Sequence, residues 1–161
     1  MRSAGLLPYR HGPGGPEVLI AHPGGPFWAR RQDGAWSIVK GEIGEHEDAL
    51  ACAVREFREE TGWTIDPAGA IPLGEVRQKA GKQVIAWAVE ADLDPSALQS
   101  EPVTIDVRGR SMTFPEIDEV RWCGRSDAVR LLNPAQAVYY ERLNEALDGP
   151  RNSRRGVRSE P

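Results

Sequence analysis

The segment from Gly41 to Trp63 constrains this chain more than any other part, because it places several acidic residues in one expected helix. Residues four apart on an α-helix lie one above the other, and residues three apart lie side by side. Glu56, Glu59 and Glu60 are therefore predicted to share one helix face. Like charges at this spacing destabilise a helix by about 0.2–0.5 kcal/mol per pair unless a cation or an arginine offsets them. The pattern indicates a site for a divalent metal ion such as Mg²⁺.

The same segment carries signals for both helix ends and for an apolar face. Asp48 is a suitable N-cap residue, and Gly62 can end the helix in the left-handed conformation. An apolar stripe at helical spacing predicts how the helix contacts the core, and its members are Leu50, Val54 and Phe57. The acidic face is then left free for chemistry.

The spacing of this segment resembles the Nudix box of Nudix hydrolases. That box reads Gly, five residues, Glu, seven residues, then Arg-Glu-apolar-any-Glu-Glu-any-Gly-apolar. A REFREE run alone would be explained by an ordinary solvated helix face. If each fixed residue occurs with a frequency of about 6%, the probability that all of them match by chance at one starting position is about 10⁻⁸ to 10⁻⁹. Every defining position is matched, by Gly41, Glu47, Arg55, Glu56, Phe57, Glu59, Glu60, Gly62 and Trp63.

The resemblance implies a metal site and a cofactor. It implies that Glu56 and Glu60 are the main ligands, that Glu59 is a ligand or the base, and that the carbonyl of Gly41 contributes. Mg²⁺ is the implied cofactor, with Mn²⁺ as the alternative. Clustered carboxylates bind such an ion through oxygen and leave positions that phosphoryl oxygens can take, so a phosphate-bearing substrate is expected.

Two further residues receive roles from the resemblance. Arg55 would orient a glutamate by ion pairing, with Glu47 as its partner. Glu116 is a candidate for an additional metal ligand or the general base, because many Nudix proteins carry a glutamate at about this place before a strand tryptophan. A surface glutamate after a proline turn is the alternative interpretation of Glu116.

Substrate contacts are expected from five residues outside the box helix. Lys40 and Lys82 could donate to phosphate, although each could equally be a solvated lysine. Arg30 lies in a Gly/Pro-rich segment that is expected to form a flexible loop. A base could stack on Tyr139 or Tyr140, because only one of two adjacent tyrosines is expected to face the core and the other then stays available.

The sequence leaves open which substrate class an enzyme of this kind would cleave, and whether the protein is an enzyme or a binding module. Residues 82–92 and 115–122 are similar to segments of asymmetrical diadenosine tetraphosphate hydrolases, which implies a dinucleoside polyphosphate or a nucleoside triphosphate as substrate. The alternatives are the same chemistry on ADP-ribose, a nucleotide sugar or capped RNA, and a non-catalytic Nudix-fold nucleotide-binding module. The intact box favours the enzymes over the module.

Length and composition predict one domain over residues 1–148. The longest apolar run, Val84 to Val89, is too short to span a membrane, and without an adequate signal-peptide core a cytoplasmic location is expected. Cys52 and Cys123 lack the spacing of a disulfide framework or a zinc site, and are expected to be buried.

The charge is distributed unevenly along the chain. The net charge is −4, but residues 149–161 hold four arginines against one glutamate, which leaves the remainder at −7. An acidic body argues against a nucleic-acid-binding surface, and the Arg-rich tail over 149–161 is expected to be disordered. Many Nudix proteins form homodimers, and the sequence leaves monomer and homodimer open.

The remaining patterns predict an α/β protein with strands and helices in mixed order. The resemblance implies the α/β/α sandwich of Nudix proteins, with a mixed β-sheet between helices. Extended segments are expected over residues 4–10, 18–22, 36–38, 83–91 and 119–123, the first two joined by an enlarged loop, and further helices over 126–132 and 134–147.

Overall fold

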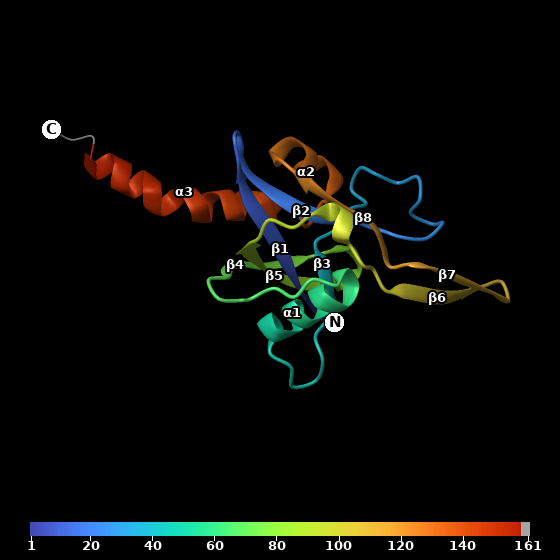
Figure 1. Cartoon of the computed structure of the whole chain (residues 1–161). Coiled ribbons are helices and arrows are strands. Elements are labelled where there is room, and N and C mark those ends of the chain that lie inside the picture. The colour runs from blue at the N-terminus through green and yellow to red at the C-terminus, as the bar shows by residue number, and fades with distance from the viewer. Residues whose placement is uncertain (159–161) are drawn as a thin grey trace.

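The computed structural model describes the backbone of residues 1–158 and the side chains of residues 1–148. Its main feature is a six-stranded sheet in the order β4-β5-β1-β2-β8, with β3 paired to β1 beside that path (Figure 1). The strands of this sheet are β1 Arg2–Gly12, β2 Gly15–Pro23, β3 Val39–Glu42, β4 Ile71–Arg77, β5 Gln83–Glu90 and β8 Ile117–Cys123. The helices are α1 Ala49–Thr61, α2 Arg125–Leu131 and α3 Val138–Arg158, and the short 3₁₀ turns are η1 Lys79–Gly81 and η2 Pro95–Ala97.

The sheet is mixed, as the resemblance implied. β1 runs parallel to β5 but antiparallel to β2 and β3, and the outer pairs β4–β5 and β2–β8 are antiparallel. The apolar run of β5 lies between β4 and β1, which confirms the expectation of an interior strand. A separate hairpin, β6 Pro102–Val107 with β7 Arg110–Pro115, extends from the body ahead of β8 (Figure 1).

Alternation along the strands builds two cores, one on each face of the sheet. In β2, Val18 and Ile20 pack with residues of α2 and α3, whereas Leu19 and Ala21 pack with residues of α1. This period of two is what a strand with both faces covered requires. The result is an α/β/α sandwich with α1 on one side of the sheet and α2 and α3 on the other.

The caps of α1 match the sequence, but its buried face is displaced from the expected stripe. The Asp48 carboxylate accepts from the Ala51 N–H at 3.0 Å, and Gly62 ends the helix with φ of 84°. The fully buried apolar residues of α1 are Cys52, Ala53 and Phe57. Leu50 and Val54 are only partly buried at the margin of the core. Cys52 and Cys123 are both buried and free, as expected.

Several elements differ from the sequence-based expectations. The hairpin β6–β7 was not expected, and the extended segment expected over residues 36–38 gives way to β3, with only isolated bridges at Trp36 and Ser37. The strands of the first hairpin continue to Gly12 and Gly15, so Pro13 and Gly14 form a tight turn instead of an enlarged loop. Strand β4 was not predicted, because a bulge at Gly74, which has a φ of 76°, interrupts the alternation of its side chains between the two faces of the sheet. The last helix begins at Val138, since residues 134–137 form a turn.

Two expectations concern the chain ends and the membrane. Among the residues that the structure describes, no helix has the length and apolar character needed to cross a membrane. The backbone of residues 149–158 continues α3, whereas their side chains, and residues 159–161 entirely, lie outside the described part. The expected disorder of the Arg-rich tail stays a prediction. The cytoplasmic location also stays a prediction.

Phe57→Ala should destabilise the protein strongly. The ring is fully buried beneath the sheet and stacks on Trp63 with 6.1 Å between centroids. Truncating such a ring costs about 3–5 kcal/mol of unfolding free energy. Leu50→Ala on the same helix is the matched control, and urea denaturation should give it a clearly smaller loss because Leu50 is only partly buried. Equal losses in the two variants would contradict the assignment of the buried face.

Candidate functional site

Arg55 organises an acidic cluster on α1 and on the loop between β3 and α1. The Arg55 Nε and Nη2 donate to the two carboxylate oxygens of Glu47 at 2.8 and 2.9 Å, which is the expected ion pair. The Arg55 Nη1 donates to Glu56 at 2.9 Å and to Glu59 at 3.0 Å. The bonds from Arg55, joined by the Gly44 N–H, lower the pKa of Glu47 to about 2. Arg55 therefore supplies the positive partner that the acidic helix requires.

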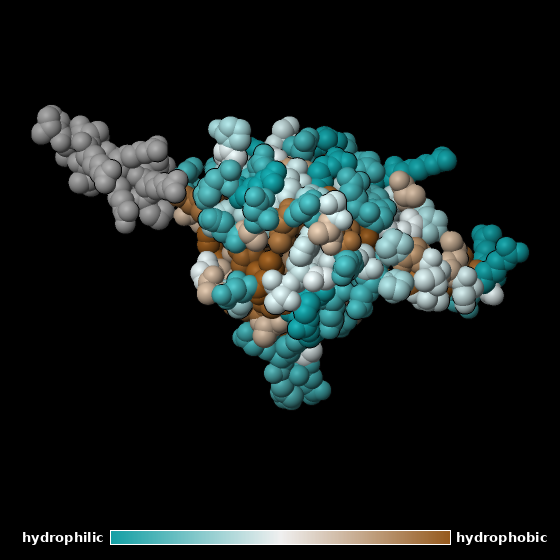
Figure 2. Space-filling model, in the orientation of Figure 1, coloured by the Kyte–Doolittle hydropathy of each residue, from teal (hydrophilic) through white to brown (hydrophobic). Residues whose placement is uncertain are grey.

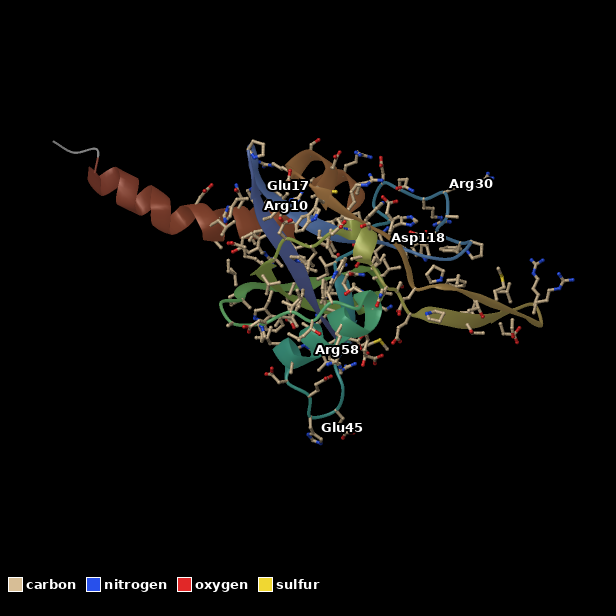
Figure 3. The ribbon with its side chains drawn as sticks, in the orientation of Figure 1. Arg10, Glu17, Arg30, Glu45, Arg58 and Asp118 are labelled. Atoms are coloured by element: carbon tan, nitrogen blue, oxygen red, sulfur yellow. The ribbon has the colours of Figure 1, made fainter. Side chains whose placement is uncertain are left out.

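The protruding loop itself is hydrophilic and solvent-exposed. Figure 2 shows it as a hydrophilic projection, and Figure 3 places Glu45 at its tip. Within the loop, the Gly44 N–H donates to the Glu47 carboxylate at 2.9 Å. The loop thereby holds Glu47 where Arg55 can reach it.

Gly41 allows the Glu56 carboxylate to lie directly against the backbone of β3. A Cβ placed on Gly41 would overlap the carboxyl group of Glu56, so a larger residue would displace that side chain. Beside it, the Cys52 thiol donates to the Gly41 carbonyl at 3.7 Å. Burial, together with the nearby Glu47, raises the pKa of Cys52 to about 11, so this residue is a neutral thiol. The Glu56 carboxylate thus lies in close contact with the backbone at Gly41.

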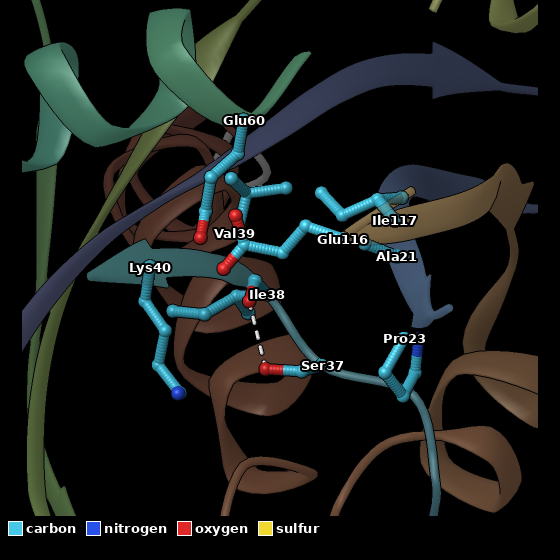
Figure 4. Close-up of a pocket in the computed structure, with 9 residues that line it drawn as sticks. All are labelled: Ala21, Pro23, Ser37, Ile38, Val39, Lys40, Glu60, Glu116 and Ile117. Carbon is cyan, nitrogen blue, oxygen red and sulfur yellow. Dashed lines mark hydrogen bonds between the residues drawn. The ribbon is translucent and has the colours of Figure 1, made fainter. Parts of the chain in front are cut away.

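Glu60 lies in a pocket where β3, α1 and the start of β8 meet (Figure 4). Its side chain points toward Glu116 in that view, although the residues come from α1 and from the segment before β8. Glu60 is 9% exposed, and burial, followed by the charge of Glu116, raises its pKa to about 9. The full lining of the pocket is Ala21, Pro23, Ser37, Ile38, Val39, Lys40, Glu60, Glu116 and Ile117.

Lys40 is the cationic member of this pocket. Burial, and secondly the neighbouring Lys82, lower the pKa of its ammonium group, while Glu60 and Glu116 act in the opposite direction. Lys82 is exposed and does not line the pocket, but its charge reaches Lys40. The pocket therefore combines two carboxylates with one lysine, and a second lysine stands nearby.

The two tyrosines are core residues, which corrects the expectation that one of them is available to a base. Tyr139 is fully buried and donates to the Val84 carbonyl at 2.6 Å. Tyr140 is 3% exposed and donates to the Pro16 carbonyl at 2.6 Å. The long first hairpin reaches α3 and covers the second ring, so adjacent tyrosines are both buried.

Arg30 and Glu59 also lie outside the pocket. Arg30 is exposed on the loop that follows β2, at the outer edge of the molecule in Figure 3. The structure therefore does not bring Arg30 to the carboxylates. Glu59 has a side chain that is 43% exposed and engaged by Arg55, so the three box glutamates occupy different environments on α1.

The loop after β2 is anchored to the segment that carries Glu116 through contacts that no sequence pattern predicts. His22 is 3% exposed, and its ring nitrogens lie 2.8 Å from an Asp118 carboxylate oxygen and 2.7 Å from the Arg31 carbonyl. The Gly24 N–H donates to the Glu116 carbonyl at 2.9 Å. The loop expected to be flexible is thus joined to the start of β8 on the pocket rim.

The donor chemistry of the site suits a hard divalent cation. Glu56 offers carboxylate oxygens beside the backbone of Gly41, Glu60 offers its own in the pocket, and oxygen is the donor that Mg²⁺ prefers. The raised pKa of Glu60 shows a buried carboxylate that a cation would stabilise in its charged form. Within residues 1–148, no group of three or more acidic, histidine or cysteine side chains is already arranged to hold a metal ion. Glu56 and Glu59 are paired with Arg55 instead.

The burial of Glu60 predicts an unusual pH dependence of stability in the metal-free protein. Its folded-state pKa is about 9 against an ordinary value of 4.5, so between these values the folded state holds a proton that the unfolded state has lost. Stability in EDTA should therefore fall as the pH rises from about 4.5 to 9. Glu60→Gln should remove this term and melt at a higher temperature than the wild type at pH 9, with a smaller difference at pH 6.

Glu45→Gln is the matched control, because the Glu45 side chain is 89% exposed. It should follow the wild-type melting curve at both pH values. A Glu60→Gln advantage of the same size at pH 6 and pH 9 would contradict the assigned environment of Glu60.

Comparisons with known proteins agree with this geometry. The model of the NUDIX domain family matches residues 2–143, and no curated protein matches the chain. The structure of a C. elegans Ap4A hydrolase binary complex is 21% identical with a TM-score of 0.64, covering 91% of this chain and 98% of that chain. The NUDIX domain of Shewanella oneidensis NrtR complexed with ADP ribose is 15% identical with a TM-score of 0.61, covering 91% and 88%.

A Nudix hydrolase from M. smegmatis, RenU, is 26% identical with a TM-score of 0.51, covering 91% of this chain and 85% of that chain. These structures share the fold, and the family model spans most of the sequence, including the complete box. The chain therefore belongs to the Nudix family and is a pyrophosphohydrolase that acts on nucleoside diphosphate derivatives.

Proposed function

We propose that this protein hydrolyses a phosphoanhydride bond in a dinucleoside polyphosphate or a nucleoside triphosphate, with Mg²⁺ or Mn²⁺ as cofactor. The observation that carries the proposal is the pocket that is lined by the buried Glu60 together with Glu116 and Lys40. Carboxylates that bind a divalent cation, next to a lysine that binds phosphoryl oxygens, form a site suited to a polyphosphate. The C. elegans Ap4A hydrolase, which shares the fold, supports the dinucleoside polyphosphate.

Glu56 and Glu60 are the proposed metal ligands, with the Gly41 carbonyl and Glu59 as further candidates. When bound, the ion would neutralise the diphosphate and acidify a water molecule. Arg55 keeps the Glu56 carboxylate against β3 through its bond of 2.9 Å. Because Glu59 is partly exposed and pairs with Arg55, its contribution is expected to be smaller than that of Glu60.

Glu116 is the proposed general base. It lines the pocket opposite Glu60, whereas Glu59, the other candidate, does not line it. A carboxylate in this place can accept the proton of the attacking water at one of its Oε atoms and orient that water toward phosphorus. The bond between Gly24 and the Glu116 backbone fixes the start of β8 and so keeps this side chain at the pocket.

Lys40 and Lys82 are the proposed phosphate contacts. Lys40 lines the pocket, and an ammonium bound to phosphoryl oxygens forms a charge-assisted hydrogen bond. Lys82 lies close enough to lower the pKa of Lys40, so one phosphate chain could satisfy both cations. Neither Tyr139 nor Tyr140 is part of the proposed site, because both are buried.

ADP-ribose is the second candidate substrate. The NUDIX domain of NrtR, solved with ADP ribose, shares the fold of this chain, and ADP-ribose contains the same diphosphate linkage. A binding module without turnover is the third candidate. A panel of diadenosine polyphosphates, nucleoside triphosphates, ADP-ribose and nucleotide sugars, incubated with Mg²⁺ and analysed for products, distinguishes these candidates.

Glu60→Gln should lower turnover by about 10²-fold or more on whichever substrate the panel identifies, given what one electrostatic contact contributes in other active sites. The amide keeps the size of the side chain but loses the charge that would hold the cation. Glu45→Gln, in the exposed loop, should retain wild-type turnover. Near-normal turnover of Glu60→Gln would place the metal site elsewhere, and removal of the metal with EDTA should abolish activity in every variant.

Gly41→Ala should also lower turnover, by about 10-fold or more, because misplacing a catalytic group by about 1 Å can cost 10²-fold. The added Cβ would overlap the Glu56 carboxyl group and displace it from β3. Gly14→Ala is the control, since no atom lies within 4 Å of a Cβ at that position. A Gly41→Ala enzyme with wild-type kcat would show that the contact between Gly41 and Glu56 is dispensable.

A further inference from the structure

Gln136 is a buried polar residue that lies outside the box and outside the proposed catalytic groups. Its side chain is 1% exposed, within the turn that precedes α3. The Ile38 N–H donates to its Oε1 at 2.8 Å, and its Nε2 donates to the Ser37 Oγ at 3.1 Å and to the Gln78 Oε1 at 2.7 Å. A neutral amide has one carbonyl oxygen and two N–H hydrogens, and here every one of these groups is engaged.

One side of this amide fixes the wall of the reaction pocket. Ser37 and Ile38 line the pocket and directly precede Val39 and Lys40. Ser37 also exchanges two backbone hydrogen bonds with Ala21, at 2.8 and 2.9 Å. The Ser37 Oγ in turn donates to the Ile38 carbonyl at 2.7 Å, which Figure 4 draws as a dashed line. The segment that presents Lys40 is therefore held by β2 and by Gln136, and Lys40 itself pairs with Gly5 of β1.

The other side fixes the turn that carries Lys82. The Gln78 N–H donates to the Lys82 carbonyl at 2.8 Å, and the Gly81 N–H donates to the Gln78 carbonyl at 3.1 Å. Gln78 is thus the first residue of a closed turn whose last residue is Lys82. The bond of 2.7 Å from Gln136 to Gln78 joins this turn to the pocket wall. Both segments adjoin strands that pair with β1, and this buried amide is the side chain that joins them directly at the proposed phosphate-binding lysines.

We propose that Gln136 is a positioning residue that sets the separation of Lys40 and Lys82, so that both ammonium groups bind one phosphate chain. The inference rests on the proposed function, because it takes the substrate to be a polyphosphate. A buried donor or acceptor that loses its partner is costly, so the three bonds hold the two segments in one arrangement. Without them, each segment keeps its pairing with β1 but loses the direct side-chain link that fixes the turn of Lys82 against the segment of Lys40.

Gln136→Met tests this role, because methionine has a similar size but offers no amide. The KM for the panel substrate should rise by about 10-fold or more while kcat stays within about threefold, since loss of a charged phosphate contact weakens ground-state and transition-state binding alike. Gln78→Met should give the same pattern. The double variant should be no worse than Gln136→Met alone, because the only bond that Gln78→Met removes from Gln136 is already lost in that variant.

Tyr140→Phe is the matched control for a general loss of stability. It lies beyond Gln136, on α3, and is also buried, and the substitution removes one hydrogen bond, to Pro16, at the first hairpin. It should lower the melting temperature and leave KM unchanged. A KM increase of equal size in Tyr140→Phe and Gln136→Met would overturn the positioning role, as would an unchanged KM in Gln136→Met.

Calorimetric binding of β,γ-methylene-ATP with Mg²⁺ separates this inference from the proposed reaction. The Kd of the full chain for this probe should weaken by about 10-fold in Gln136→Met, even if the wild type hydrolyses nothing in the panel. Binding without turnover would reject the proposed reaction and still support the role of Gln136. A wild type that does not bind the probe at millimolar concentration, or equal Kd values in wild type and variant, would overturn the inference.

Discussion

The ion-pair network of Arg55 is the interaction on which the site depends. Its guanidinium engages both oxygens of Glu47 and reaches Glu56 and Glu59, so one cation offsets three carboxylates on or beside α1. Partly exposed ion pairs contribute little to stability in most proteins. Here their main consequence is geometric, because a bidentate arginine fixes orientation. The acidic helix can therefore form without a cation already present.

The second constraint is the burial of Glu60 at the end of a helix that is anchored by apolar residues. Phe57 and Ala53 hold α1 against the sheet, and this places Glu60 in a pocket where burial opposes its charge. Burial makes the charged form of Glu60 unfavourable, and such a cost is expected where the function needs a charged carboxylate in a low-dielectric environment. Functional sites commonly concentrate such perturbed groups. Burial thus favours the neutral form of Glu60, whereas metal binding requires its charged form.

Much of this arrangement could be predicted from the sequence, because it depends on local spacing. The caps of α1, the pairing of Arg55 with Glu47 and the interior position of β5 follow from patterns over short stretches. The proximity of Glu116 to Glu60 came from family resemblance, since residues 56 apart carry no periodic signal of contact. The structure brings them into one pocket.

The errors arose where distant segments decide the outcome. Adjacent side chains on a helix point in different directions, which suggested that Tyr139 or Tyr140 would be accessible. The first hairpin is longer than its Gly/Pro content suggested, so it covers Tyr140 and supplies the Pro16 carbonyl as a partner. Gln136 was missed for a similar reason, because its partners lie 58 to 99 residues away in the sequence.

We propose that Glu56 and Glu60 bind a divalent cation beside Gly41. A crystal of the protein soaked in Mn²⁺, measured at a wavelength where manganese scatters anomalously, shows where the ion binds. We expect an anomalous peak in contact with the carboxylates of Glu56 and Glu60. A peak bound only by other residues, or no peak at millimolar Mn²⁺, would rule out this metal site.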